Sequence, residues 1–532
     1  MRCLYFISLF AVFCFAALNA AGAIVCDGLL YDITSWEDRT VEVVGIDENL
    51  NTNSITIPSK IICNDDTYIV TGISHQAFNS NLDLTDVKIE EGISHIGEMA
   101  FYNCKNILNI DIPSTITTIG IAAFQNCESL RQISLPDDIE FMGRYLFYNC
   151  KSMEKVSLPL NLTGIPAFTF YNCTSLTELN HLPVIIHIGE CAFYGCSSIK
   201  NLRSTFQPYY IEDNAFRKCS ALTELPFDNT VTNIGNNAFE GCASLITLDL
   251  SDIDAVWGES VFSNCSSLKH VRLPNNIDII PQGMFEDCGA LEQIALPNGL
   301  ITIGERAFAN AQHLIDITIP KSLKNIGNRA FSGSGLQEID FQNLSMVIGD
   351  GAFENNSALI NLNITGVTEI GQSAFANCTA LETVEISNSL LNIGTEAFSN
   401  CPLLLAIYVN STIPPTITIN TFTNYTETYA TLYVLTGYRN TFALATYWDR
   451  FMNIHEIYNF PSSSNEIAVG SVTITQKYNT VCIDNYRGVV KVYTISGQLV
   501  ASEYSDGHAS FSLDNGTYIV VGEDFTQKIL LN

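Results

Sequence analysis

Apolar residues recur along this chain with a period of 23 residues, and a phenylalanine marks the same place in each copy. The first twelve of these phenylalanines are 23 residues apart, and the last four follow at spacings of 22, 22, 23 and 24. They are Phe78, Phe101, Phe124, Phe147, Phe170, Phe193, Phe216, Phe239, Phe262, Phe285, Phe308, Phe331, Phe353, Phe375, Phe398 and Phe422. A fixed period of this size is typical of a solenoid, in which each copy forms one coil stacked on the next.

The copy that begins at Leu130 indicates how one side of each coil is built. Ile133 and Leu135 alternate with the polar residues Gln132 and Ser134. This alternation predicts a strand whose apolar side chains point inward and whose polar side chains point outward. We call the side made by this strand in every coil the first wall.

A second apolar segment predicts the opposite side of the coil, which we call the second wall. In one copy it is the strand-like run Ile116–Ile119, which Gly120 ends at a turn. Residues Ala123–Cys127 then predict a tight helical turn, with Phe124 as an apolar plug between the walls. We therefore expect a β-rich solenoid with short helical turns, made of about 15 coils of 22–24 residues.

The repeat unit resembles that of the BspA-like leucine-rich repeat proteins, L-x-x-I-x-I-P…I-x-x-I-G-x-x-A-F-x-x-C. Residues Leu130–Pro136, Ile139–Gly143 and Ile234–Cys242 carry this pattern, and the resemblance covers roughly residues 55 to 455. The copies depart from it at Phe168–Phe170 and at Trp257, which replaces the isoleucine before the glycine. The resemblance implies a leucine-rich repeat solenoid at a bacterial surface, with host extracellular-matrix proteins or other bacteria as partners.

The two ends of the chain differ from the repeats. Arg2, the apolar run Leu4–Leu18 and the small residues before Ile24 predict a secretory signal peptide. Short alternating runs up to residue 75 predict a β cap, and the aromatic-rich segment around Trp448 predicts a second cap. We weighed sugar stacking as an alternative role for Trp448, and core packing is favoured by its spacing from other aromatics.

Beyond residue 466 the pattern changes to that of a small β-sandwich of seven or so short strands. The runs Val492–Val500, Gly516–Val520 and Lys528–Leu531 resemble the C-terminal sorting domains of the type IX secretion system of Bacteroidetes. That resemblance implies export to the cell surface or the extracellular space. The expected organisation is a signal peptide at 1–23, an N-terminal β cap at 24–75, repeats at 76–410, a C-terminal cap at 411–460, a linker at 461–466 and a β-sandwich at 467–532.

Seventeen cysteines in an exported chain would ordinarily suggest disulfides. Eleven of them, however, occupy one slot, three residues after a repeat phenylalanine, and other copies hold Ala311, Ser334 or Asn356 there. A slot that accepts these four residue types predicts a small buried side chain, and therefore a ladder of free thiols. Cys26 and Cys63 lie outside the ladder, and the sequence leaves open whether they pair.

Charge and motif content limit the function. Acidic residues outnumber basic ones by 55 to 25, for a net charge of −30, which argues against a nucleic-acid or anionic-lipid partner. We find no phosphate-binding loop, no nucleophile elbow and no metal-binding motif, and we expect neither a cofactor nor a metal nor enzymatic activity. No segment of the mature chain reads as a transmembrane span.

The variable outward positions of the first wall are where recognition would be encoded, because solenoids bind ligands on extended regular faces. The candidate contact residues are Lys155, Glu178, Arg203, Asp249, His270 and Arg272. The first hypothesis is an adhesin-like surface protein that binds an extracellular protein or glycan. The alternatives are a structural spacer of the cell surface and, less favoured, a carbohydrate-active enzyme. The sequence makes no prediction of the oligomeric state.

Overall fold

The computed structural model describes residues 23–457, apart from 181–183, 203–205 and 342, together with the C-terminal segments 466–469, 472–477, 480–495, 498–513, 516–522 and 526–531. The predicted signal peptide and the predicted linker thus lie outside the described residues, except for the last residue of each. The chain divides into two compact units. Unit 1 is Met1–Pro297 with Arg306–Gln312, and unit 2 is Asn298–Glu305 with His313–Asn532.

Unit 1 begins with antiparallel hairpins that join directly onto the two walls. Strands β1, β2 and β3 form an antiparallel meander, and β5 lies antiparallel to β6. These first strands are β1 (Ile24–Cys26), β2 (Leu29–Ser35), β3 (Thr40–Ile46), β4 (Ser54–Ile57), β5 (Lys60–Cys63) and β6 (Asp66–Ile73). Because β3 pairs in parallel with β6, the ladder of parallel strands begins within the hairpin region.

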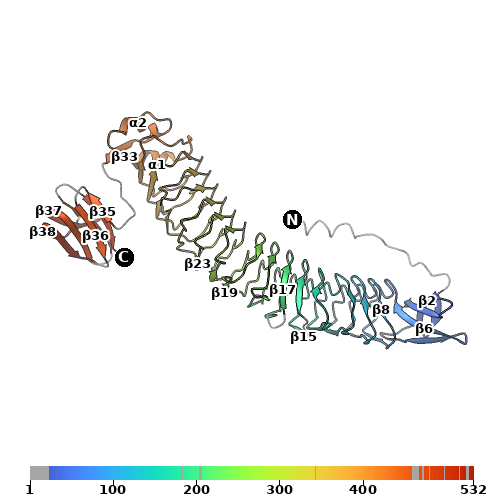
Figure 1. Cartoon of the computed structure of the whole chain (residues 1–532). Helices are drawn as coiled ribbons and strands as arrows, with labels where there is room; N and C mark the ends of the chain where they lie inside the picture. Colours follow the sequence, from blue (N-terminus) through green and yellow to red (C-terminus); the bar gives the residue numbers. More distant parts are fainter. Residues whose placement is uncertain are drawn as a thin grey trace. The chain divides into compact units, whose positions relative to one another are not determined.

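The first wall of unit 1 consists of short parallel strands, one from each of most coils (Figure 1). They are β7 (Asp86–Ile89), β9 (Asn109–Asp111), β11 (Gln132–Ser134), β13 (Lys155–Ser157), β15 (Glu178–Asn180), β19 (Thr247–Asp249), β21 (His270–Arg272) and β23 (Gln293–Ala295). Gln132 lies opposite Lys155, and Lys155 opposite Glu178, so equivalent positions of successive coils stand side by side. As predicted, Ile133 is buried while Gln132 and Ser134 are exposed.

The second wall of unit 1 is a matching ladder of shorter strands. They are β8 (His95–Ile96), β10 (Thr118–Ile119), β12 (Phe141–Met142), β14 (Gly164–Ile165), β16 (Ile185–Ile188), β17 (Phe206–Ile211), β18 (Asn233–Ile234), β20 (Val256–Trp257) and β22 (Ile279–Ile280). Most of these short strands are followed by a glycine, as β10 is by Gly120, and this glycine allows adjacent coils to approach closely. A Cβ atom on Gly120 would lie 2.4 Å from the backbone nitrogen of Glu98, which is too close for any other residue.

The repeat phenylalanines form the core between the walls. Those of unit 1 are at most 2% exposed, and their rings stack on those of the neighbouring coils with centroids 5.1 to 5.9 Å apart. Offset stacking of this kind is a favourable arrangement of aromatic rings. The predicted plug is therefore a continuous aromatic ladder.

The turn that carries each phenylalanine is a pair of tight turns rather than a helix. Ala122 and Asn126 have φ angles of 55° and 61°, and the equivalent residues of other coils also lie in the left-handed region. Asparagine and glycine tolerate this conformation best, which explains their frequency before the cysteine. Alternate amides donate to the next coil, as Phe101 N–H does to the Ala123 carbonyl at 2.8 Å, so the turns hold the coils together. We call this side of the solenoid the turn edge.

The predicted ladder of buried thiols is present. The cysteines of the repeat slot are free and buried, and Cys26 and Cys63 are free as well. Each repeat thiol donates to the carbonyl of a phenylalanine in the preceding coil, as Cys127 does to Phe101 at 3.3 Å. Where asparagine fills the slot, Asn356 is fully buried and its amide donates to the carbonyls of Phe331 and Phe353 at 2.9 Å. The slot thus selects a small side chain that can satisfy a buried carbonyl.

Unit 2 contains a further stretch of the same solenoid, and the described residues form three short helices near the C-terminal end of that stretch. Its first-wall strands are β26 (Glu338–Asp340), β28 (Asn361–Asn363), β30 (Thr383–Ser387), β32 (Ala406–Asn410), β33 (Thr431–Leu435) and β34 (Asn453–Ile457). Its second-wall strands are β24 (Thr302–Ile303), β25 (Asn325–Ile326), β27 (Val347–Ile348), β29 (Glu369–Ile370) and β31 (Asn392–Ile393). The helices are α1 (Asn424–Tyr429), α2 (Arg439–Ala443) and the 3-10 helix η1 (Trp448–Arg450).

Trp448 closes the aromatic core of unit 2. It is 1% exposed, its indole N–H donates to the Pro415 carbonyl at 2.8 Å, and its ring lies within 5.8 Å of the rings of Phe422 and Phe451. A buried indole cannot stack on a sugar, so the core-packing role predicted for this residue is confirmed.

The described C-terminal residues form the predicted β structure as one antiparallel sheet of six strands, some of them longer than the seven or so short strands expected for a β-sandwich. They are β35 (Glu466–Val469), β36 (Val472–Lys477), β37 (Thr480–Thr494), β38 (Leu499–Ser512), β39 (Gly516–Val521) and β40 (Thr526–Leu531). The long strand β37 pairs with β38 along most of its length, with β36 at its start and with β39 at its end. One buried apolar cluster includes Val481 of β37, Phe511 of β38 and Val520 of β39. Ser496 and Gly497, which belong to the run Val492–Val500, lie outside the described residues.

Candidate functional site

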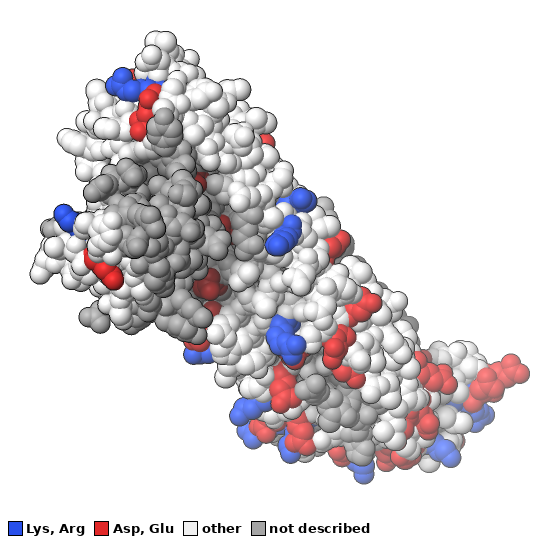
Figure 2. Space-filling view, turned by 60° about the vertical axis from the view of Figure 1, so that its left-hand side comes forward, with Lys and Arg blue, Asp and Glu red and all other residues white. Residues whose placement is uncertain are grey.

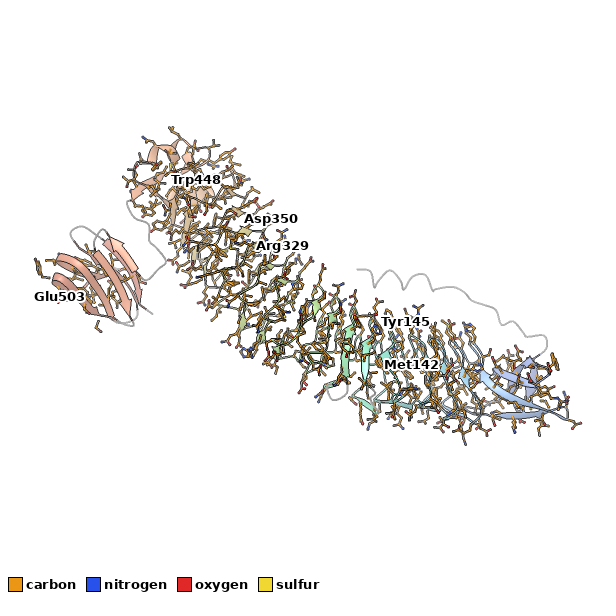
Figure 3. All side chains as sticks on the ribbon, viewed as in Figure 1. Met142, Tyr145, Arg329, Asp350, Trp448 and Glu503 are labelled. Atoms are coloured by element: carbon orange, nitrogen blue, oxygen red, sulfur yellow. The ribbon has the colours of Figure 1, made fainter. Side chains whose placement is uncertain are left out.

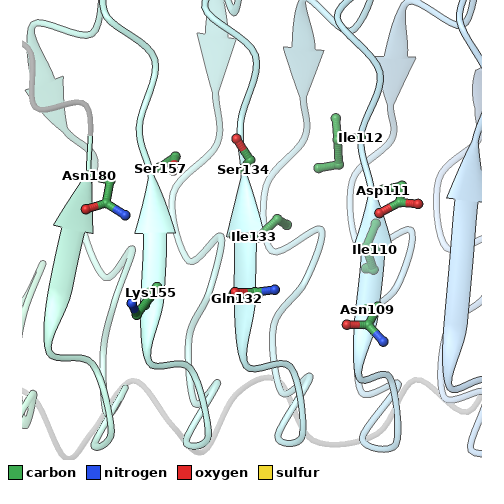
Figure 4. Close-up of a pocket in the computed structure, with 10 residues that line it drawn as sticks. All are labelled: Asn109, Ile110, Asp111, Ile112, Gln132, Ile133, Ser134, Lys155, Ser157 and Asn180. Carbon is green, nitrogen blue, oxygen red and sulfur yellow. The ribbon is translucent and has the colours of Figure 1, made fainter.

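The outward face of the first wall in unit 1 carries a depression of about 400 Å³ (Figure 4). It crosses strands β9, β11, β13 and β15. The residues that line it are Asn109, Ile110, Asp111, Ile112, Gln132, Ile133, Ser134, Lys155, Ser157 and Asn180. Most of its lining side chains are polar, because the strand alternation turns every second residue toward solvent.

The depression exists because short side chains follow one another along one row of the wall. Ser134 lies opposite Ser157, and Ser157 lies opposite Asn180, on three successive strands. The parallel row on the same strands holds the longer residues Gln132 and Lys155. A row of short side chains beside a row of long ones leaves a trough that runs across the coils.

The polar groups of this face can recognise a ligand by hydrogen bonding. Hydroxyl and amide side chains both donate and accept, and the Asp111 carboxylate accepts only. A second depression of about 430 Å³ adjoins the first and shares Asp111 and Ile112 with it, and Lys88, Glu90 and Glu91 line its other part. The two together give one continuous, mostly polar surface on the first wall.

The structure places the candidate contact residues in two separate groups and pairs most of them. The Lys155 ammonium lies 2.9 Å from the Glu178 carboxylate and lowers the pKa of that group. Arg272 lies 3.2 Å from Asp249, whose pKa is lowered first by hydrogen bonds from Ser251 and then by Arg272. His270 is exposed on β21 beside this second pair. Arg203 lies outside the described residues.

These pairs join residues of consecutive coils, so part of each charge is neutralised by a neighbour. Lys105 and Lys151 likewise flank Glu128, and Lys269 pairs with Glu292. In the face shown in Figure 2, basic and acidic side chains are accordingly interspersed rather than gathered by sign. Exposed pairs of this kind contribute about 0–1 kcal/mol each to stability, and they leave a surface of mixed charge.

The candidate residues chosen from sequence are charged and do not include the small residues that shape the depression. Ser134 is predicted to point outward, but the row that it forms with Ser157 and Asn180 becomes apparent only when the three strands lie side by side. The available signal was the succession of small outward residues at a spacing of 23.

No three His, Cys, Asp or Glu side chains in the described part come together in an arrangement that could hold a metal ion. Among those same residues, no helix is both long enough and apolar enough to cross a bilayer.

Glu385 is the most perturbed carboxyl among the outward positions of unit 2. It lies on β30 opposite Asn363 on one side and Tyr408 on the other. Burial and then the negative charge of Asp340 raise the pKa of Glu385 to about 7. This carboxyl group therefore changes charge near neutral pH, unlike a typical surface glutamate.

Comparison with known proteins agrees with the repeat architecture. The ranges 71–200, 186–315 and 278–405 match the family described as BspA type leucine rich repeat region, and together they span more than half of the chain. A leucine-rich repeat protein from Bacteroides ovatus is 25% identical, with a TM-score of 0.48, over 69% of this chain and 95% of that one. A leucine-rich cell surface protein from Faecalibacterium prausnitzii is 21% identical, with a TM-score of 0.34, over 82% of this chain and 100% of that one.

The pneumococcal vaccine antigen PcpA is also similar, at 17% identity and a TM-score of 0.32, over 82% of this chain and 99% of that one. No curated protein matches the chain. The period, the two walls, the buried phenylalanine ladder and the family match agree with one another. The chain belongs to the BspA-type leucine-rich repeat proteins.

Proposed function

We propose that this chain is a non-enzymatic binding protein of the bacterial exterior, which recognises an extracellular protein or glycan along the first wall of unit 1. The observation that carries the proposal is the polar depression across β9, β11, β13 and β15. Several coils contribute residues to the lining of this depression, the polar groups of the lining face solvent, and charged side chains of both signs lie along its edge. Membership of a leucine-rich repeat family supports binding as the general activity.

An exterior location rests on several features of the sequence. The predicted signal peptide supports export, and the resemblance of residues 467–532 to sorting domains supports transport by a type IX secretion system. The adhesin role and the matrix-protein partners come from the family resemblance. Deleting residues 467–532 and fractionating the cells tests the sorting role: we expect the truncated chain to accumulate in the periplasm, and unchanged surface exposure would refute it.

The binding proposal is tested with the purified chain on a panel of matrix proteins and glycans. Replacing Ser134 and Ser157 by arginine fills the trough with two long side chains, and we expect it to abolish binding of any panel member that the unmodified chain binds. Ser357→Arg is the matched control, because Ser357 is exposed but lies on a turn of unit 2.

Two results would refute the proposal. One is the absence of saturable binding to every panel member. The other is binding that the paired substitution leaves unchanged. The spacer alternative predicts a third pattern, in which deleting whole repeats changes the cell-surface phenotype while charge reversals along the first wall do not.

A further inference from the structure

An aromatic cluster lies on the turn edge of unit 1, where most other coils carry polar or small residues. We call it the tyrosine ladder; it consists of Tyr145, Tyr148, Phe168, Tyr171 and Tyr194. Tyr148, Tyr171 and Tyr194 stack with centroids 4.5 and 4.6 Å apart, and Tyr145 stacks on Phe168 at 4.6 Å. Figure 3 labels Tyr145 on this edge.

The solenoid itself does not require these rings. In the preceding coil the two equivalent positions hold Ala122 and Gln125, and in the following coil they hold Asn214 and Arg217. The aromatic set therefore begins and ends within three coils. All five rings remain partly exposed, so water contacts apolar surface that neighbouring coils cover with polar atoms.

The geometry of the ladder favours a protein partner over a sugar. Each ring lies parallel to the next, with interplanar angles of 4° to 11°, so the flat faces cover one another and the ring edges and hydroxyls face outward. Sugar rings stack on exposed aromatic faces, and in this ladder the faces between coils are covered by the neighbouring rings. Protein interfaces, by contrast, are enriched in tyrosine and arginine, and tyrosine supplies a large contact area at low entropic cost.

Two charges of opposite sign occupy equivalent positions at the ends of the ladder. Arg144 lies three residues before the plug Phe147, and Glu190 lies three residues before the plug Phe193. Arg144 has its guanidinium 5.7 Å from the Tyr145 ring, and no carboxylate in the described part of the chain forms an ion pair with it. Nor does any described cation pair with Glu190, whose charge is opposed by burial, Asp213 and Glu212, which raise its pKa.

We propose that the tyrosine ladder is the interface of a homodimer, in which a second copy of this chain packs antiparallel against the first. A two-fold axis through the middle coil, that of Phe170, reverses the order of the coils and keeps each row facing its equivalent. Phe168 and Tyr171 of one copy then meet the same residues of the other. Arg144 of each copy meets Glu190 of the other, because both occupy the same row at equal distances from the axis.

The charges select this arrangement over the alternative symmetric one. An axis along the solenoid would keep the coil order and would place Arg144 and Glu190 opposite aromatic positions, leaving both without a partner. In the antiparallel arrangement the pair between Arg144 of one copy and Glu190 of the other forms twice, once on each side of the axis, as a self-complementary two-fold interface requires. A stable interface of this kind covers about 800 Å² per partner, so the contact extends to the coils on either side of the ladder.

The test is the oligomeric state of the intact purified chain, measured by sedimentation velocity between about 1 and 100 µM. We expect a reversible equilibrium between monomer and dimer. R144E and E190R each remove the attraction and create repulsion, so each should weaken the dimer at least tenfold. The double variant R144E/E190R restores complementary charges and should recover most of that loss. R131E is the matched control on the exposed first wall and should leave the dimer unchanged.

A second variant keeps the test informative if a charge reversal perturbs folding. Replacing Tyr148, Tyr171 and Tyr194 by glutamine installs the residue that Gln125 already supplies at this position, and we expect a monomer with an unchanged circular-dichroism spectrum. A wild-type chain that stays monomeric over the whole range overturns the proposal. So does a dimer that survives the glutamine variant, or a double charge reversal that fails to recover the dimer. The residues differ from those of the first-wall site, so the two proposals fail independently.

Discussion

Truncating one plug phenylalanine in the middle of the aromatic ladder tests how strongly the stability of a coil depends on its neighbours. Phe239 is fully buried, and its ring stacks on Phe216 at 5.2 Å and on Phe262 at 5.7 Å. Phe78 is the matched control, since it is 2% exposed and stacks on one ring of the described residues, that of Phe101, at 5.1 Å. The two side chains bury nearly the same area, so their difference reports the second stacked neighbour of Phe239 together with its tilted contact to Phe227, whose ring centroid lies 5.7 Å away.

The expected magnitudes follow from burial and stacking. Truncating a buried phenylalanine to alanine costs about 3–5 kcal/mol, and each well-formed aromatic pair adds about 0.5–1.5 kcal/mol beyond burial. We therefore expect Phe239→Ala to fall near about 5 kcal/mol and Phe78→Ala to cost about 1 kcal/mol less. Because every 1.4 kcal/mol is a factor of ten, a loss of about 5 kcal/mol should make the amides around Phe239 exchange roughly three- to four-thousandfold faster.

Native-state hydrogen exchange read by mass spectrometry is the suitable assay, because repeat arrays do not always unfold in one step. The amide of Phe216 donates to the Ala238 carbonyl at 2.8 Å, and the amide of Phe239 donates to Val261 at 2.9 Å. Faster exchange should therefore centre on these coils and fade within one or two coils on each side. Uniform acceleration over the whole chain, or a larger effect of Phe78→Ala, would refute this account of neighbour coupling.

Three further predictions concern packing, protonation and thiol reactivity. Gly120→Ala should destabilise the chain by about 1–3 kcal/mol in urea unfolding. Gly299→Ala is the control, because its Cβ would meet no atom within 4 Å, and it should change stability by less than about 0.5 kcal/mol. Equal costs would contradict the close approach of the coils at Gly120. The folded state keeps the proton on Glu385 up to a pKa of about 7, so the free energy of unfolding falls as pH rises from about 4.5 to 7. Glu385→Gln should therefore be more stable than the unmodified chain by roughly 1–3 kcal/mol above pH ~7 and differ little from it below pH ~4. An equal shift in melting temperature at both pH values would refute this. Burial raises the pKa of the Cys150 thiol far above its usual range, so an alkylating reagent should modify Cys150 only in denaturant. The same reagent should modify the partly exposed Cys63 in the folded chain. Similar alkylation rates of the two thiols in the folded chain, measured by peptide mass spectrometry, would contradict the buried ladder.

The two walls could be predicted from sequence because one pattern recurs in more than a dozen copies. A single alternating run such as the one around Ile133 is ambiguous, but its repetition at 23 residues leaves only a stack of coils that buries the same positions. Counting across copies also identified the cysteine slot, since Ala311, Ser334 and Asn356 fill it elsewhere. The local conformation of the turn was harder, because left-handed residues at Ala122 and Asn126 depend on hydrogen bonds to the next coil.

The sequence by itself thus determined the architecture, the inward residues and the candidate face of this protein, because stacking identical coils allows few solutions. Only the tertiary structure decided which outward residues act together. Neighbours on the walls and on the turn edge are 22–24 residues apart in sequence. The role that an outward residue can play therefore depends on the side chains that the stacking of coils places beside it. Lys155 is a candidate charge in the sequence, but in the structure it is paired with Glu178, while Ser134 and Ser157 shape the trough. The tyrosine ladder likewise became a surface only when three coils placed its rings in contact.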